Sequence, residues 1–203
     1  MKKYAVLHEP GDIVTLAGTR FVVLDVERRG SLPDSLFLLA LESVGASEFG
    51  SSNNYAESDL KKAVDKWLED MGKRGLDNAK LIPREIDLTT LDGSGCYGKL
   101  SVKAAPLTLD EAREYADIIP NAERWCWLAT GWSGPSKSDG DLALYVNSDG
   151  DWDGNGCSSS YGIRPALKVP SILFEDSEAG LDLSKIPTDD LLQEIHRRLA
   201  EKA

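Results

Sequence analysis

The chain contains 203 residues, with 23 Lys and Arg against 34 Asp and Glu, and its formal net charge is -11. A surface this acidic repels a phosphate backbone, and no basic patch in the sequence offsets the repulsion, so nucleic acid is not an expected partner. Hydrophobic residues at 41% and charged residues at 28% are typical of a globular domain and not of a disordered chain. A chain of this length can form one sizeable core.

Signals for export, membrane insertion and disulfide formation are weak. The apolar run near the start of the chain ends at His8, too early to form the core of a signal peptide. No run approaches the roughly 18 apolar residues of a membrane span. Cys96, Cys126 and Cys157 are odd in number and widely spaced, which fits neither a disulfide framework nor a paired zinc motif. We expect a cytoplasmic protein without a membrane partner; a virion-associated protein is the alternative.

The first forty residues predict antiparallel strands. β-Branched and aromatic residues fill the runs 13–16 and 21–26, and residues 17–20 between them are typical of a hairpin turn. The run 36–41 is apolar throughout, which is typical of a strand covered on both faces.

Two helices are predicted after these strands. Between residues 57 and 72 apolar side chains recur at helical spacing, and Ser58 can begin the helix while Gly72 or Gly75 can end it. Further along, Thr108 and Glu111 form a capping-box pattern, which predicts a second helix that stops before Pro120.

Residues 124–169 have no helical period and predict strands at 125–128, 142–146 and 162–169, joined by long polar loops. Trp125 and Trp127 lie two residues apart on one strand face, where we expect both to belong to the core.

The C-terminal region divides the chain into three parts. We expect a main domain over residues 1–174, a linker over 175–187 and an amphipathic helix over 188–203. One apolar stripe runs along that helix and consists of Leu191, Leu192, Ile195 and Leu199. The stripe must be covered, either by the main domain or by a second copy of the chain in a homo-oligomer.

Several runs resemble, in the same order, a bacterial and phage-associated domain family. These runs are residues 21–26, 36–41, 53–60, 67–68, 127–128 and 161–167, and the last contains Gly162-Ile163-Arg164-Pro165-Ala166. The resemblance covers about residues 11–170. The chain departs from the family at Ala129, where an Arg usually follows Trp-Leu.

The order of helices, Trp-rich strands and late Gly-Ile-Arg strand also resembles the C-type-lectin fold. Formylglycine-generating-type domains and the variable proteins of diversity-generating retroelements use that fold. The resemblance implies an α+β protein in which two helices pack on a small antiparallel sheet with long polar loops. In a retroelement protein the variable loop derives from mutated Asn codons, and Trp152 cannot arise from such a codon. Trp152 is therefore scaffold, or its loop is not a variable region.

One stretch satisfies half of a calcium-binding loop. Asp149, Asp151 and Asp153 alternate before Gly154, as in the first half of that motif. The twelfth position is Ser160 and not the bidentate Glu, and the flanking segments are predicted strands. A solvated hairpin turn is therefore favoured over a Ca²⁺ site, and no other cofactor is expected.

The polar loops carry the candidate ligand-binding residues. Trp132 and Trp152 stand among Gly, Ser and Asp, where an exposed indole can bind a sugar face or a partner protein, although loop tryptophans also fold back as plugs. The candidate set is Trp132, Tyr145, Asn147, Asp151, Trp152, Asn155, Ser159 and Tyr161.

No complete catalytic signature is present. The Gly-rich segments match neither a nucleophile elbow nor a phosphate-binding loop, and the two histidines, His8 and His196, lie near the termini, far in sequence from the cysteines. For Arg164 we favour a structural role, in which its guanidinium donates hydrogen bonds to loop carbonyls and holds them in place.

We therefore expect a non-enzymatic module without catalytic residues, presenting loops 131–141 and 147–161 to a protein or glycan ligand. A relative of the formylglycine-generating enzymes and a structural component of a phage particle are the alternatives.

Overall fold

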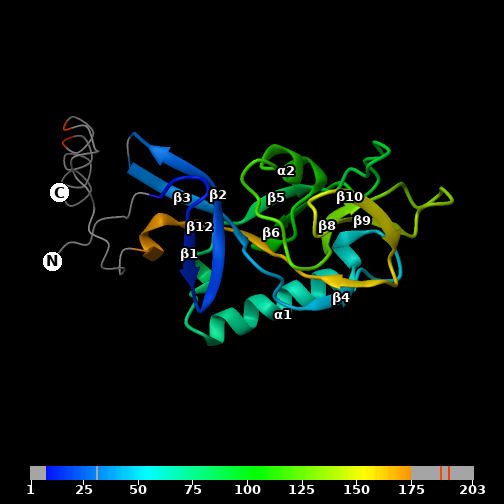
Figure 1. Cartoon of the computed structure of the whole chain (residues 1–203), viewed down its shortest axis with the longest axis horizontal. Helices are drawn as coiled ribbons and strands as arrows, with labels where there is room; N and C mark the ends of the chain where they lie inside the picture. Colours follow the sequence, from blue (N-terminus) through cyan, green and yellow to red (C-terminus); the bar gives the residue numbers. More distant parts are fainter. Residues whose placement is uncertain (1–7, 31, 175–187, 189–191, 193–203) are drawn as a thin grey trace.

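The computed structural model describes residues 8–30, 32–174, 188 and 192, and it has a mixed α+β architecture, as expected. Two antiparallel-rich sheets follow one another along the long axis of the molecule, and two helices lie on opposite sides (Figure 1). The expected linker 175–187 and nearly all of the expected helix 188–203, with its oligomer-forming stripe, lie outside the described residues.

The first sheet has the strand order β1-β2-β3-β12-β7. Its strands are β1 (Ile13–Leu16), β2 (Thr19–Arg29), β3 (Leu32–Ala40), β12 (Ala166–Pro170) and β7 (Ala104–Ala105). The tight turn between β1 and β2 places Ala17 and Gly18 at φ values of 46° and 75°, and two successive positive φ values are what a two-residue hairpin turn of this hand requires. The three expected N-terminal strands are confirmed.

The second sheet has the strand order β10-β9-β8-β11-β4. Its strands are β10 (Trp152–Gly156), β9 (Leu142–Val146), β8 (Cys126–Gly131), β11 (Ser160–Gly162) and β4 (Ala46–Glu48), and a separate pair joins β5 (Arg84–Asp87) to β6 (Lys99–Val102). The expectation of one strand over 162–169 is wrong. The chain leaves the second sheet at Gly162 and enters the first sheet at Ala166, so residues 163–165 cross between the two sheets.

The two predicted helices are confirmed with their caps. In α1 (Asp59–Lys73) the Ser58 side chain accepts the Lys61 amide, and Gly75, with φ 104°, follows the last turn. In α2 (Leu109–Glu114) Thr108 and Glu111 form the expected capping box. Short 3-10 turns lie at η1 (Tyr55–Glu57), η2 (Asn78–Lys80) and η3 (Ser171–Phe174). None of the described helices is long and apolar enough to span a membrane.

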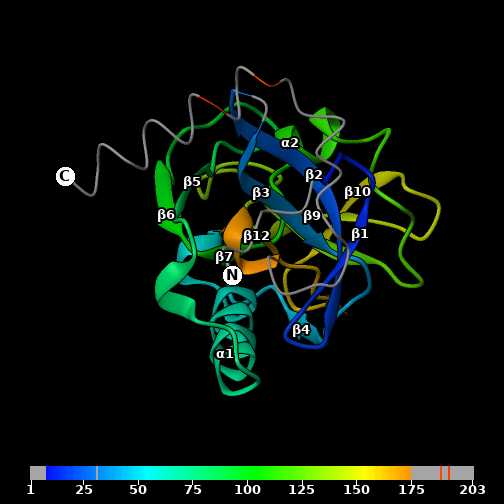
Figure 2. The same ribbon diagram turned by 90° about the vertical axis from the view of Figure 1, so that its left-hand side faces the viewer.

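Both faces of the first sheet are buried, as the apolar run 36–41 predicts. On one face Phe21, Val23 and Leu38 pack in the main cluster, which also contains the buried residues of α1. On the other face Val22 and Leu39 pack with Leu128 and Leu144 of the second sheet and with α2. Seen from the end of the molecule, α1 and α2 lie on opposite sides of this sheet (Figure 2).

A buried asparagine, Asn53, holds loop 131–141 in place, although the sequence pattern gives it no role in that loop. Asn53 is 1% exposed, and its Nδ2 donates to the carbonyls of Ser133 (2.9 Å) and Leu142 (3.0 Å), one at each end of the loop. Its Oδ1 accepts the hydroxyl of Tyr97 at 2.6 Å. Because a single carboxamide bonds to both ends of the loop, the two ends are held close together independently of the conformation of the exposed tip.

Candidate functional site

Aromatic side chains gather on one face of the second sheet. Trp127 on β8, Tyr145 on β9 and Tyr161 on β11 contact one another, with ring centroids 4.6 Å apart for Trp127 and Tyr161 and 4.9 Å apart for the two tyrosines. Trp125, just before β8, stacks on Tyr145 at 5.1 Å with the ring planes 12° apart. We call these four residues the aromatic platform.

The platform changes from buried to exposed along its length. Trp127 is 1% exposed, and its Nε1 donates to the carbonyl of Ser47 at 3.0 Å. Trp125 is 44% exposed, so the expectation that it belongs to the core is wrong. It does share a face with Trp127, but it lies just before β8 begins, and among the described strands none continues the sheet past it on that face.

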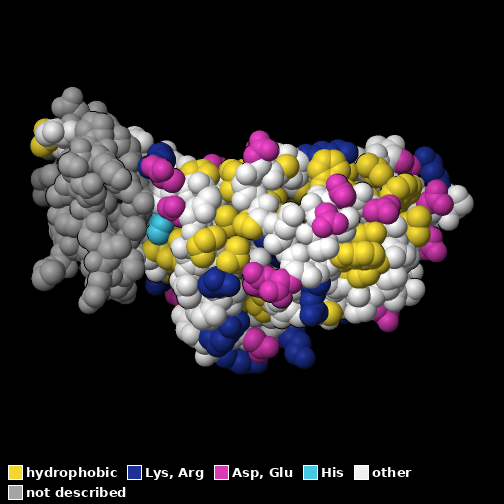
Figure 3. Space-filling model, in the orientation of Figure 1, with side chains coloured by type: hydrophobic (Ala, Val, Ile, Leu, Met, Phe, Trp, Pro, Cys, Tyr) yellow, Lys and Arg dark blue, Asp and Glu magenta, His cyan; other side chains and the backbone are white. Residues whose placement is uncertain are grey.

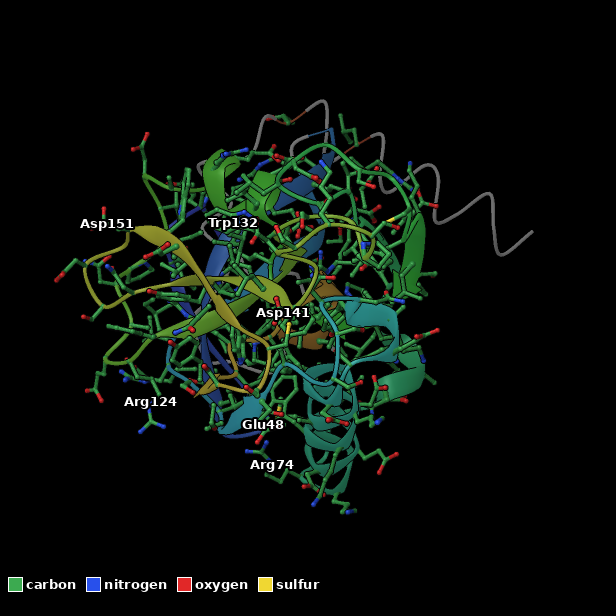
Figure 4. The ribbon with its side chains drawn as sticks, turned by 90° about the vertical axis from the view of Figure 1, so that its right-hand side faces the viewer. Glu48, Arg74, Arg124, Trp132, Asp141 and Asp151 are labelled. Atoms are coloured by element: carbon green, nitrogen blue, oxygen red, sulfur yellow. The ribbon has the colours of Figure 1, made fainter. Side chains whose placement is uncertain are left out.

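A groove of about 390 Å³ lies beside the exposed indole. We call it the aromatic groove, and it is lined by Ala46, Glu123, Arg124, Trp125, Ser148, Ser160, Tyr161 and Gly162. A second hollow of about 360 Å³ shares Glu123 and Arg124 with it and continues towards residues 42–45. Arg124 projects from the surface at this end of the molecule (Figure 4).

The tyrosine hydroxyls of the platform interact with polar side chains of β10. The Asn155 Nδ2 donates to the hydroxyl of Tyr161, and the Asn155 Oδ1 accepts the amide of Gly156 at 2.7 Å. Burial, together with the nearby carboxylate of Asp153, raises the pKa of Tyr145. The Tyr145 phenol therefore stays neutral under physiological conditions, so the indole of Trp125 stacks on an uncharged ring.

Trp132, expected to contact ligand, lies elsewhere. It is half-buried and packs against the apolar cluster on the opposite face of the sheet. A Cβ at Gly154 would overlap the Trp132 ring, so the indole can pack directly on the β10 backbone only because this residue is glycine. Trp132 therefore packs back against the cluster, as the plug alternative left open by its sequence context describes.

Trp152 is exposed but faces away from the groove. It is 42% exposed and lies on β10 opposite Val146, and the guanidinium of Arg113 stands 5.0 Å above its ring. Successive residues on a strand point to opposite faces, so Trp152 lies on the face opposite Tyr145. One small ligand cannot contact both Trp125 and Trp152.

The stretch 147–161, expected to be a loop, is a hairpin end followed by β10 and the start of β11. The Asn147 Oδ1 accepts the amides of Asp149 (2.8 Å) and Asp151 (3.0 Å), which is an ordinary role for asparagine in a turn. Ser159 lies in the turn before β11, where its amide donates to the carbonyl of Gly156, and it does not line the groove.

The three aspartates of the expected calcium motif do not form a cluster. Asp149 and Asp151 lie on the hairpin turn, whereas Asp153 lies on β10 opposite Tyr145. In the described part of the chain, no three His, Cys, Asp or Glu side chains are placed to hold one metal ion. Whether the turn binds Ca²⁺ stays a prediction, and the arrangement of these three side chains gives it no support.

The cysteines are not arranged as activated nucleophiles. Burial raises the pKa of Cys126 to about 11 and that of Cys157 to about 12. Both thiols stay protonated at neutral pH, and the thiol is the weak form of the nucleophile. Cys96 is exposed, and the one described histidine, His8, packs against Phe174 at 5.4 Å. This chemistry does not favour the thiol-enzyme alternative.

Comparison of the chain with protein-family models, with curated proteins and with solved structures gives no match. The assignment of function therefore depends on the chemistry of the groove.

Proposed function

We propose that the chain is a non-enzymatic recognition module of C-type-lectin-like architecture that binds a glycan in the aromatic groove. The observation that carries the proposal is the exposed Trp125, held in place by its stack on Tyr145 and by the edge of Tyr161, with ring centroids 5.1 Å and 5.6 Å away. An indole that is already immobilised loses little further freedom when a ligand binds to it. Two helices on largely antiparallel sheets, with Trp-rich strands leading into the groove, support the architecture.

The remaining groove residues supply the polar contacts that a sugar requires. Ser148 and Ser160 offer hydroxyls, Glu123 offers acceptors and Arg124 offers a fork of donors, all around one apolar ring. The apolar face of a sugar ring can pack on Trp125 while its hydroxyls bond to these groups. A groove of this volume matches a small ligand better than the flat surface of about 800 Å² per partner that a stable protein complex needs. The glycan is therefore favoured over the protein ligand.

The proposal moves the site from where the sequence pattern placed it. Of the two loops expected to form the site, only the region 147–161 contributes to the groove, through Ser148, Ser160 and Tyr161, and no residue of loop 131–141 lines it. Residues 123–125 and Ala46 complete the groove from segments that carry no recognisable motif.

Two tryptophans with nearly the same exposure test this proposal. Trp125→Ala removes the proposed anchor, and Trp152→Ala removes an indole of nearly equal exposure from the other face. We expect the unaltered protein to bind on a glycan array, and Trp125→Ala to weaken binding to the best oligosaccharide at least about tenfold, as loss of an aromatic anchor does. Trp152→Ala should bind as the unaltered protein does.

Each failure has a separate meaning. If the unaltered protein binds no glycan, the ligand class is wrong. If Trp152→Ala weakens binding and Trp125→Ala does not, the site is wrong and lies on the other face of the sheet. Circular dichroism of each variant checks that a loss of binding is not a loss of fold.

A further inference from the structure

The second hollow continues the aromatic groove along the same surface. Its lining consists of Glu42, Ser43, Val44, Gly45, Glu123 and Arg124. Glu123 and Arg124 also line the groove, so the two spaces meet at these two side chains. At about 390 Å³ and 360 Å³, each space lies near the lower end of the range of about 300–1,000 Å³ for small-ligand sites. Each therefore has room for one small chemical unit.

Backbone hydrogen bonds fix both walls of the second hollow to the crossing between the two sheets. The Val44 amide donates to the carbonyl of Ile163 at 2.8 Å, and the Ile163 amide donates to the carbonyl of Gly45 at 3.0 Å. On the other side, the Gly162 amide donates to the carbonyl of Trp125 at 2.8 Å. Because the neighbouring residues 162 and 163 hold both walls, the hollow is formed before a ligand binds, and little binding energy is lost in ordering it.

The crossing itself is anchored to the first sheet. The Arg164 Nε donates to the carbonyl of Ala40 at 2.7 Å, and the Ala40 amide donates to the carbonyl of Pro165 at 2.9 Å. Holding a carbonyl in place is the structural role expected for Arg164. The segment that carries both walls of the hollow is therefore fastened to the end of β3.

The two walls approach each other closely at Gly162. A Cβ at this position would meet the Ser43 Oγ and the Cys126 Sγ at 2.8 Å. It would also lie 3.0 Å from the carbonyl oxygen of Trp125. These separations are shorter than van der Waals contact, so a larger residue would push the two walls apart. The shape of the hollow therefore depends on glycine at this position.

Three charged side chains around the second hollow are available to a ligand. Glu42, Glu123 and Arg124 are exposed, and within the described part of the chain their side chains make no hydrogen bond or ion pair. Ser43 differs, because its hydroxyl donates to the carbonyl of Gly45 at 2.6 Å. Carboxylates accept hydrogen bonds and a guanidinium donates them, while a sugar hydroxyl can do both. The second hollow therefore suits a hydroxyl-rich unit beside the one that packs on an indole.

The charges of this surface disfavour an acidic sugar. Glu42 and Glu123 outweigh Arg124 at the second hollow, and Asp and Glu side chains are spread over the end of the molecule that the second sheet forms (Figure 3). The whole chain has a net charge of -11. This field repels a ligand carboxylate, whereas an uncharged sugar keeps its hydrogen bonds without repulsion.

We propose that the aromatic groove and the second hollow form one extended site for an uncharged oligosaccharide of at least two sugar units. The inference rests on the proposed glycan-binding function and adds the length and the charge of the ligand. One unit packs on Trp125, and the next lies in the second hollow, where it bonds to Glu42 and Arg124. The second unit gains contacts without a second loss of translational freedom, so a disaccharide binds more tightly than a monosaccharide.

Isothermal titration calorimetry of the full chain tests the length of the ligand. The probes are the mono-, di- and trisaccharides of glucose, mannose and N-acetylglucosamine. In the series that binds, we expect the disaccharide to have a Kd at least about tenfold below that of the monosaccharide, and the third unit to add less than about threefold. Equal Kd values for the mono- and disaccharide would overturn the two-unit site and leave the glycan function standing. Absence of binding in every series would overturn the glycan function itself.

The charge of the ligand is tested with the uronic-acid counterpart of the disaccharide that binds. We expect its Kd to be at least about threefold higher than that of the neutral disaccharide, because the carboxylate meets an acidic surface. Tighter binding of the uronic acid would overturn the assignment of an uncharged ligand.

Glu42→Ala tests whether the second unit lies in the second hollow. Glu42 lines only that hollow, so its loss should lower the ratio of disaccharide to monosaccharide affinity at least about fivefold. Ser148→Ala, which alters the groove alone, should weaken both sugars by the same factor and keep the ratio. Glu114→Ala is the matched control, because it removes an exposed carboxylate at the end of α2 that lines neither space, and both affinities should stay unchanged. An unchanged ratio in Glu42→Ala would overturn the placement of the second unit.

Discussion

Large aromatic rings pack differently on the two faces of the second sheet. On the α2 face, Gly154 leaves room for the indole of Trp132, which lies half-buried against the apolar cluster. On the other face large rings stand side by side from Phe49 to Trp125, and the last ring extends beyond the strands that could cover it. A glycine beneath Trp132 allows the indole to pack against the apolar cluster, whereas the row of large rings leaves its final member, Trp125, largely exposed.

The largest expected effect is at the buried centre of this row. Trp127→Ala should lower the free energy of unfolding by about 3–5 kcal/mol, because it leaves a cavity among Phe49, Tyr145 and Tyr161 and removes the hydrogen bond to Ser47. Urea denaturation measures the loss, and Trp127→Phe should recover part of it. A cost below about 1 kcal/mol would show that the row of rings does not stabilise the fold.

The α2 face can be tested through Gly154. Gly154→Ala places a methyl group in the Trp132 ring and should cost about 1–3 kcal/mol, as overpacking does. Gly156→Ala is the matched control on the same strand, because its Cβ would meet only the Ser158 Oγ at 3.9 Å. We expect the control to stay within about 0.5 kcal/mol. Equal denaturation midpoints for the two variants would contradict the role of Trp132 as a plug.

Sequence reasoning succeeds where local chemistry decides the outcome. Ser58 and Thr108 begin helices because their hydroxyls satisfy backbone amides three residues on, and that requirement can be read without knowing the rest of the fold. The run 36–41 likewise predicts a strand buried on both faces, since only such a strand can hide consecutive apolar residues.

It fails where the outcome depends on which strands become neighbours. The alternating pattern continues through residues 162–169, so it cannot reveal that Arg164 and Pro165 carry the chain from one sheet to the other. The spacing of Trp125 and Trp127 gives their common face but not the point at which that face ends. The groove was missed for the same reason: Ala46 meets residues 123–125 through long-range pairing of β4, β11 and β8.

Alanine substitutions of the two exposed tryptophans should differ moderately in how much they lower the free energy of unfolding. Trp125→Ala should cost about 1 kcal/mol, because it removes an aromatic stack on Tyr145. Trp152→Ala should cost about 0.5 kcal/mol or less, because its contact with Arg113 is a single cation–π pair at the surface. Denaturant midpoints measure both. A loss at Trp152 as large as that of Trp127→Ala would show that this ring is part of the core.

The smallest expected effect is that of calcium on the turn between β9 and β10. A ligand that binds only the folded state raises Tm by mass action, and a site made by Asp149, Asp151 and Asp153 would therefore respond to millimolar Ca²⁺. Asp153 lies on β10 opposite Tyr145, while the other two carboxylates belong to the turn, and in the described part of the chain the three are not placed to hold one ion. We expect a shift in Tm below about 1 °C, equal in the unaltered protein and in Asp151→Asn. A saturable rise that Asp151→Asn abolishes would show instead that the turn rearranges to bind the ion.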